Sequence, residues 1–260
     1  MHLIIYGTII IFATFFGAFA GLGGGVIIKP VLDLIGYDTV DAVNFISACA
    51  VFSMSISSTA KHIKAKTEID FKFIITLSAG AVLGGFTGSF LFDSLLNIVS
   101  NGILKSIQGI ILCALLLISV IYINIKNKKS FKVKNKLGII LIGFILGCTA
   151  SFLGVGGGPI NVAFLVFFFS MTMKEAAVYS VGTIFFSQLS KLISTGINHT
   201  VPNIEPITII VAVICAVLGG ILGAEINKRA NEKAVKTVFT VIVAGIAIVN
   251  LYNAVTGLIA

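Results

Sequence analysis

Long apolar runs, separated by short polar stretches, dominate the pattern of this 260-residue chain. About 20 apolar residues are needed to cross a bilayer as a helix. Unbroken runs of that length alternate with two longer runs that clusters of glycine interrupt, so the pattern predicts an all-α polytopic membrane protein. The predicted transmembrane helices are residues 42–60, 71–92, 102–124, 176–196, 206–225 and 236–256, and the broken runs are 3–36 and 137–171.

Composition agrees with this pattern. Hydrophobic residues make up 57% of the chain and charged residues only 11%, whereas soluble domains carry about 25% charged residues. The net charge of +8 comes from basic residues in short loops, which is the positive-inside pattern of membrane proteins and requires no nucleic-acid partner. We therefore expect a lipid bilayer around the chain. The cysteines lie singly within apolar runs, which favours packing over a disulfide or a metal site; they are Cys49, Cys113, Cys148 and Cys215.

Two glycine clusters break the apolar runs, GLGGG at 21–25 and GVGGG at 154–158. Glycine costs about 1 kcal/mol relative to alanine inside a helix, so each cluster is expected to end one helix before another begins. The short helices that follow would direct unpaired N–H groups and the positive end of the helix dipole at the break. We therefore predict an anion site there, with the glycines Gly23, Gly24, Gly25, Gly156, Gly157 and Gly158.

A second motif, AVLGGxxG, occurs at 81–88 and again at 216–223, each time after a glycine cluster. Motifs repeated in one order at similar spacing indicate an internal duplication. The predicted organisation is a first transmembrane repeat over 1–125, a lysine-rich cytoplasmic linker over 126–136, and a second transmembrane repeat over 137–260.

The lysines and arginines in the loops indicate how each broken run lies in the membrane. If both runs crossed once, these residues would divide ten to five between the two sides. If each run turns back at its glycines, all fifteen lie on one side, as the positive-inside rule favours. Each repeat then holds a re-entrant helix hairpin and three transmembrane helices. The two repeats are inverted relative to each other, a common plan in secondary transporters.

Four polar residues extend the candidate site. Lys29 lies one turn after the first break, and an intramembrane charge is a functional candidate; the alternative is a lysine that snorkels to the membrane surface. Asn161 has a similar place in the second half, where it either binds substrate or joins helices by a hydrogen bond. Ser53 and Ser187 occupy matching places in the spans that follow the breaks. Each of these spans carries a polar stripe, and such stripes pack more often than they bind.

Other chemistries have little support in the sequence. GLGGG lacks the third glycine of a dinucleotide-binding fingerprint, and no βαβ unit is available to carry one. Walker motifs, paired carboxylates and nucleophile–base arrangements are also absent from the sequence. We therefore expect no enzymatic activity, no cofactor and no metal.

At its repeated motifs the sequence resembles the TauE/SafE family, also called the 4-toluene sulfonate uptake permease family. The likeness rests on GLGGGVIIKPVLDLIGYDTVDAV, GVGGGPINVAFL and AVLGGxxG, and it covers nearly the whole chain. The resemblance implies a multi-pass protein of the bacterial inner membrane that moves sulfur-containing anions such as sulfite and sulfonates, mostly by export. Lys29 departs from the apolar residue that family members often have at this position.

Two classes of function remain open. We favour a secondary transporter of a small anion that is held at the glycine breaks near the midplane, with a proton or another ion as the coupling partner. The alternative is an ion channel or cation permease that uses backbone carbonyl groups at the same breaks. The sequence leaves open the substrate, the direction of transport, the coupling ion and the formation of a homodimer.

Overall fold

The computed structural model describes residues 2–64, 70–125 and 130–259, and these ranges form ten α-helices. Lys66 and residues 126–129 of the predicted linker lie outside the described residues. The first five helices are α1 (His2–Ala20), α2 (Gly25–Ile35), α3 (Val40–Lys64), α4 (Phe71–Leu96) and α5 (Asn101–Asn124). The second five are α6 (Lys136–Leu153), α7 (Gly158–Phe169), α8 (Met173–Ile197), α9 (Pro206–Arg229) and α10 (Glu232–Ile259).

Eight of the described helices are long and apolar enough to cross a bilayer: α1, α3, α4, α5, α6, α8, α9 and α10. The protein is therefore an all-helical, multi-pass membrane protein, as the sequence predicts. The short helices α2 and α7 have 11 and 12 residues and begin at the glycine clusters. Gly24 and Gly157 precede them with φ of 67° and 71°, a conformation that interrupts the helix at little cost to glycine.

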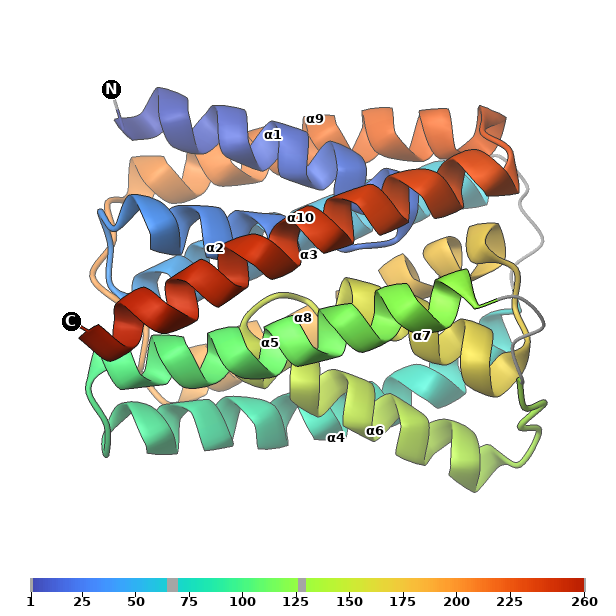
Figure 1. Cartoon of the computed structure of the whole chain (residues 1–260), viewed down its shortest axis with the longest axis horizontal. Coiled ribbons are helices and arrows are strands. Elements are labelled where there is room, and N and C mark those ends of the chain that lie inside the picture. The colour runs from blue at the N-terminus through green and yellow to red at the C-terminus, as the bar shows by residue number, and fades with distance from the viewer. Residues whose placement is uncertain (1, 65–69, 126–129, 260) are drawn as a thin grey trace.

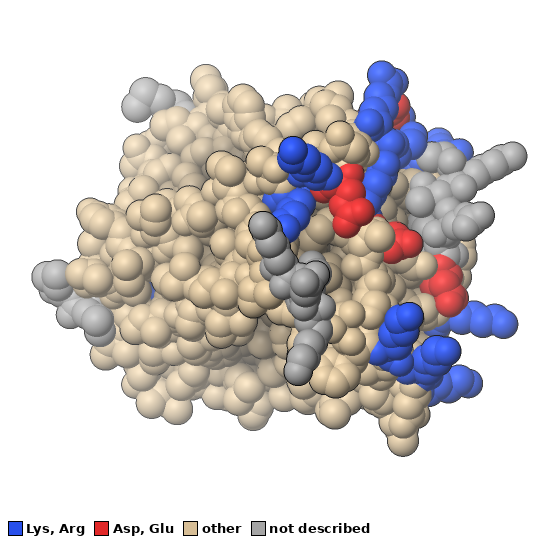
Figure 2. Space-filling model, turned by 45° about the vertical axis from the view of Figure 1, so that its right-hand side comes forward, with Lys and Arg blue, Asp and Glu red and all other residues tan. Residues whose placement is uncertain are grey.

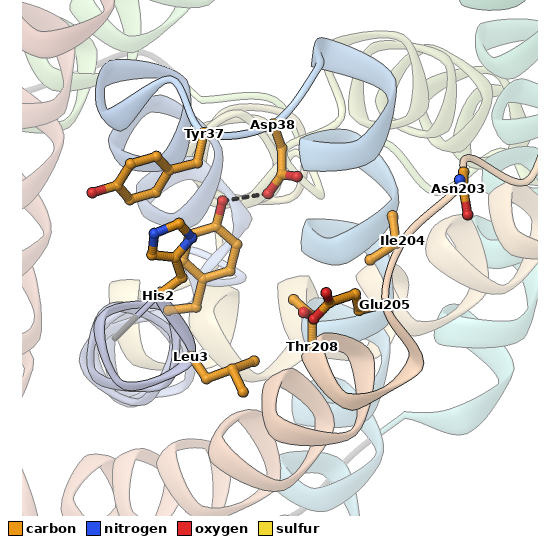
Figure 3. A pocket seen from close by; sticks show the side chains of 9 residues that line it. His2, Leu3, Tyr37, Asp38, Asn203, Ile204, Glu205 and Thr208 are labelled. Carbon is orange, nitrogen blue, oxygen red and sulfur yellow. Dashed lines mark hydrogen bonds between the residues drawn. The ribbon is translucent and has the colours of Figure 1, made fainter.

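The first broken run turns back on itself. The Tyr6 hydroxyl donates a hydrogen bond to the Asp38 carboxylate, and the His2 ring stacks on Tyr37 with centroids 4.3 Å apart. His2 and Tyr6 belong to the start of α1, whereas Tyr37 and Asp38 follow the end of α2. Figure 3 shows Tyr37 beside His2 at this closure. The helices α1 and α2 therefore form a hairpin whose glycine tip lies inside the bundle (Figure 1).

The second broken run forms a hairpin that opens at the opposite end of the bundle (Figure 1). The backbone N–H groups of Phe131 and Val133 donate to the carbonyl groups of Phe167 and Phe168, at 2.7 and 3.0 Å. The chain enters α6 shortly afterwards, at Lys136. The start of α6 and the end of α7 therefore lie together.

We name the two ends of the bundle by what they carry. The terminal end holds the start of α1, the loop after α2 and the end of α10, and the linker end holds residues 130–135 (Figure 1). Every described lysine and arginine lies at the linker end except Lys29, Lys105 and Lys191. Figure 2 shows these charges gathered on the side turned forward, with few charges elsewhere on the visible surface. This asymmetry supports the prediction that the linker end is cytoplasmic.

Helices from the two halves pack on each other through glycine faces. A Cβ on Gly80, Gly84 or Gly88 of α4 would lie 1.9, 2.0 or 2.2 Å from a carbonyl oxygen of α6. In the matching pair of α9 and α1, a Cβ on Gly223 would lie 2.1 Å from the Phe15 carbonyl oxygen. The repeated AVLGGxxG motif therefore permits close helix packing, as small-residue motifs do in membranes.

The two halves interlock instead of forming separate bodies. The helix α1 packs on α9, and its counterpart α6 packs on α4. Likewise α3 packs on α9 as α8 packs on α4, and α2 packs on α10 as α7 packs on α5. This correspondence supports an internal duplication, although the repeat limits 1–125 and 137–260 stay a prediction.

Candidate functional site

The two glycine breaks adopt the same backbone conformation. In each, the first, third and fourth residues of the motif have φ between 67° and 77°, a region that glycine enters without a steric penalty. These residues are Gly21, Gly23 and Gly24 in the first break and Gly154, Gly156 and Gly157 in the second. Side chains at these positions would strain the backbone, which explains why both breaks need several glycines.

The tips of the two hairpins meet backbone to backbone. A Cβ on Gly25 would lie 2.5 Å from the carbonyl oxygen of Val155, and a Cβ on Gly158 would lie 1.8 Å from that of Leu22. The contact is reciprocal, because the first residue of each short helix lies against the second residue of the opposite motif. Glycine is therefore required at both positions, and the two tips leave no space for a side chain between them.

The short helices start without a side-chain cap, after Gly24 and Gly157. The first N–H groups of a helix carry partial positive charge, which makes an uncapped start attractive to an anion. The carbonyl groups of Leu22 and Val155 approach these starts from the opposite break. An anion at these helix starts would therefore have to approach from the flanking helices rather than between the tips.

Two apolar side chains cover the tips from the flanking helices α3 and α8. Val51 would lie 2.9 Å from a Cβ on Gly25 and 3.0 Å from one on Gly156. Ile184 would lie 2.7 Å from a Cβ on Gly23. Both side chains are buried, and α3 packs directly on α8. We call the contact between α3 and α8 the α3–α8 seam. Val51 and Ile184 form an apolar layer about halfway along this seam, and we call this layer the constriction.

Polar side chains without partners occur along the seam on both sides of the constriction. Towards the terminal end, the side-chain polar atoms of Asn44 and Gln188 and the Nζ of Lys191 are buried with no hydrogen-bond partner among the described residues. Towards the linker end, the same holds for Ser58 Oγ and His62 Nδ1. Buried polar groups are costly unless they are satisfied, so these atoms favour the seam as the route of a polar ligand.

Lys29 lies one turn into α2 and pairs with Asp33. Its Nζ is 3.0 Å from Asp33 Oδ2, and the two side chains are 3% and 8% exposed. Lys29 therefore does not reach the surface as a snorkelling lysine would. The Lys105 ammonium group also donates to the Asp33 backbone carbonyl at 2.7 Å. The charge of Lys29 is compensated within its own helix, and its contact with substrate stays a prediction.

Asn161 lies at the second break, whereas Ser53 lies away from the constriction. The Oδ1 atom of Asn161 is buried without a partner among the described residues, and it would lie 3.0 Å from a Cβ on Gly157. Ser187 is buried and donates to a carbonyl group of its own helix at 3.0 Å. Ser53 donates within its own helix at 2.8 Å, and two helical steps place it about 200° around α3 from Val51. The roles of these three residues stay predictions.

Sequence reasoning overlooked the part that Gln188 and Lys191 play in the seam. Both are at most 5% exposed, although glutamine and lysine normally reach solvent. A signal was available, because Ile184, Gln188 and Lys191 recur at helical spacing and share one face of α8. Only the packing shows that neither polar side chain has a partner among the described residues.

A separate pocket of about 230 Å³ opens at the terminal end. Figure 3 shows the carboxylates of Asp38 and Glu205 among its lining residues, together with His2. The Asp38 carboxylate already accepts the hydrogen bond from Tyr6. Two carboxylates repel a negative charge at short range, and none of the described lysines and arginines lines this pocket to offset them, so the pocket does not suit an anionic ligand.

The similarity to known proteins agrees with this geometry. Residues 6–250 match the family described as sulfite exporter TauE/SafE. The chain is also 30% identical over 187 residues to a probable membrane transporter protein of Methanocaldococcus jannaschii. That alignment covers 68% of this chain and 66%, slightly under two thirds, of the relative. The family match includes both glycine breaks and the seam, and the chain therefore belongs to the TauE/SafE sulfite exporter family of membrane transporters.

Proposed function

We propose that this protein is a secondary transporter that exports a small sulfur-containing anion, such as sulfite or a sulfonate, across the bacterial inner membrane. The family to which the chain belongs supports the substrate class. In this proposal the linker end faces the cytoplasm, and a proton or another ion is the coupling partner. The substrate is held beside the two glycine breaks, near the middle of the bilayer.

The observation that carries the proposal is the meeting of two uncapped helix starts with a seam of unsatisfied polar groups. Gly24 and Gly157 precede the two helix starts, and neither start has a side-chain cap. The side-chain Nδ2 of Asn44 and Nε2 of Gln188 are buried donors without partners among the described residues. An anion beside the tips would satisfy donors of both kinds, which a purely structural bundle has no need to leave free.

The arrangement of the hairpins also suits alternating access. One hairpin opens at the terminal end and the other at the linker end (Figure 1). Each half packs on the other through corresponding helix pairs. We infer that the halves are inverted repeats, and that rocking of one against the other opens the seam first to one side and then to the other.

The alternative, a channel or cation permease, would need free carbonyl groups at the breaks. The Gly21 carbonyl accepts a hydrogen bond from the Ser180 hydroxyl at 2.8 Å. The Leu22 carbonyl lies against Gly158, and that of Val155 lies against Gly25. One of these carbonyl groups is thus hydrogen-bonded, and the other two are covered by the opposite hairpin tip. An anion bound to N–H and side-chain donors therefore fits this site better than a bare cation.

Transport out of sealed vesicles tests the proposal. Purified protein is reconstituted into vesicles, and the vesicles are loaded with radiolabelled sulfite, sulfate, thiosulfate or 4-toluenesulfonate, with and without a pH gradient. We expect flux of at least one sulfur anion above that of empty vesicles, and a change of rate when the gradient is imposed. Flux of K⁺ or Na⁺ without any anion flux would overturn the proposal in favour of the cation pathway.

A further inference from the structure

A small cavity lies at the terminal end of the α3–α8 seam, between α3, α4 and α8. Its volume is about 50 Å³, several times the roughly 10–15 Å³ that one water molecule requires. The cavity therefore has room for a compact ion of a few heavy atoms, whereas the ring of an aromatic sulfonate would extend beyond it. Its principal polar lining residues are Asn44, Ser89 and Lys191, with Asp41 and Asp93.

Three of these side chains carry polar atoms that nothing in the described residues satisfies. Asn44, Ser89 and Lys191 are 2%, 4% and 5% exposed. The Nδ2 and Oδ1 of Asn44, the Oγ of Ser89 and the Nζ of Lys191 are all buried without a hydrogen-bond partner there. One such atom is costly, and a cluster of them around one cavity indicates a bound polar ligand.

The charges around the cavity change from its inner to its outer part. Lys191 is buried and has no ion-pair partner among the described residues. Its Nζ lies 5.9 Å from the centroid of the Phe92 ring. The carboxylates of Asp41 and Asp93 belong to half-buried residues nearer the surface. The inner part thus offers the amino group of Lys191 and neutral donors, while the outer part is acidic. An anion would bind at the inner part, and the outer carboxylates would keep its affinity low enough for release.

The cavity also adjoins the second glycine break. A Cβ on Gly154 would lie 2.0 Å from the Oδ1 of Asn44. One residue therefore contacts the break and lines the cavity.

We propose that this cavity is a binding subsite for a small inorganic oxyanion at the terminal end of the transport route. Lys191 is its cationic ligand, and Asn44 and Ser89 donate hydrogen bonds to it. The inference rests on the proposed transport of sulfur anions and narrows it, because the cavity size selects compact inorganic anions over aromatic sulfonates.

Isothermal titration of the purified protein in detergent tests the subsite. The probes are sulfite, sulfate and 4-toluenesulfonate, and the exposed Lys72→Met at the linker end is the control variant. We expect Lys191→Met to weaken binding of the inorganic anions at least tenfold and Lys191→Arg to retain part of it, whereas Lys72→Met leaves it unchanged. The aromatic sulfonate is expected to show no Lys191-dependent binding.

Asp93→Asn separates an anion site from a cation or proton site. Removing a carboxylate from the outer part is expected to tighten oxyanion binding severalfold, because repulsion is lost. Weaker binding in Asp93→Asn, or unchanged binding in Lys191→Met, would overturn the subsite. If Lys191→Met fails to fold, Ser89→Ala takes its place beside Asp93→Asn. We expect Ser89→Ala to bind the oxyanion severalfold more weakly than the wild type. Wild-type affinity in Ser89→Ala would count against the subsite.

Vesicle transport distinguishes this inference from the function on which it rests. Lys191-dependent binding in a protein that transports none of the sulfur anions would refute the proposed transport and leave the subsite standing. Sulfite transport with a wild-type KM in Lys191→Met would refute the subsite and leave the transport proposal standing.

Discussion

Lys29 and Asp33 form an ion pair one turn apart on α2, with Nζ and Oδ2 separated by 3.0 Å and both side chains almost fully buried. Two buried charges compensate each other, and removal of one leaves the other without a partner in a medium of low dielectric constant. A substitution at Lys29 therefore affects both the ion pair and any contact of Lys29 with substrate. A loss of transport in a single variant could come from the unpaired carboxylate alone.

We expect Lys29→Met to lower the free energy of unfolding by about 3 kcal/mol or more, because it isolates the Asp33 carboxylate. The double variant Lys29→Met/Asp33→Asn is expected to recover most of that loss. Thermal unfolding in detergent measures both. Equal destabilisation in the single and double variants would show that the ion pair does not hold α2 in place.

The double variant also tests Lys29 as a substrate ligand. If Lys29 contacts the anion, the stable double variant is expected to bind it at least tenfold more weakly, which corresponds to about 1.4 kcal/mol. Wild-type affinity in that variant would leave the ion pair with a structural role only. Titration with sulfite provides the measurement.

Gly158→Ala is expected to abolish transport and to lower stability by about 1–3 kcal/mol, as overpacking does. The added Cβ would lie 1.8 Å from the Leu22 carbonyl oxygen, so the two hairpin tips must separate. Gly245→Ala is the control, since nothing lies within 4 Å of a Cβ there. Normal transport by Gly158→Ala would refute the contact between the tips.

Gly84→Ala tests the close crossing of α4 and α6. The new Cβ would lie 2.0 Å from the Phe144 carbonyl oxygen, and we expect a lower unfolding temperature than in the wild type. Gly182→Ala serves for comparison, because its nearest neighbour would be Ile74 at 3.4 Å, an ordinary contact. Equal effects of the two substitutions would contradict the glycine-mediated packing.

Cysteine labelling tests the orientation in the membrane. On a background without the native cysteines, Thr200→Cys is expected to react with an impermeant thiol reagent in intact cells. Lys134→Cys is expected to react only after permeabilisation, because the linker end carries the positive charge. The reverse pattern would place the terminal end in the cytoplasm.

Much of the fold can be read from the sequence because its causes are local or statistical. Helix propensity places the breaks at the glycines, and loop charge predicts that the runs 3–36 and 137–171 turn back. The pairing of Lys29 with Asp33 was also readable, since residues four apart share a helix face. That spacing was overlooked.

The site itself depends on contacts that no local rule encodes. The approach of Leu22 to Gly158 joins residues from different halves, and so does the contact of Asn44 with the second break. Helical spacing puts Asn44 and Lys191 on polar faces of α3 and α8, but it gives no sign that both lack partners beside one cavity. Satisfaction of a polar group is a property of its surroundings, so it becomes visible only once the helices are packed.

The packing of α1 on α9 has a consequence for how the protein is made. The chain leaves the ribosome N-terminus first, at roughly 5–20 residues per second, so about 10–40 s pass between the synthesis of Ala20 and that of Pro206. During this interval the first hairpin lacks the helix against which α1 packs. Its non-helical tip holds backbone groups that lipid cannot satisfy. The earliest helices must therefore wait, shielded by the translocation machinery or by a provisional contact, until almost the last helix has been inserted.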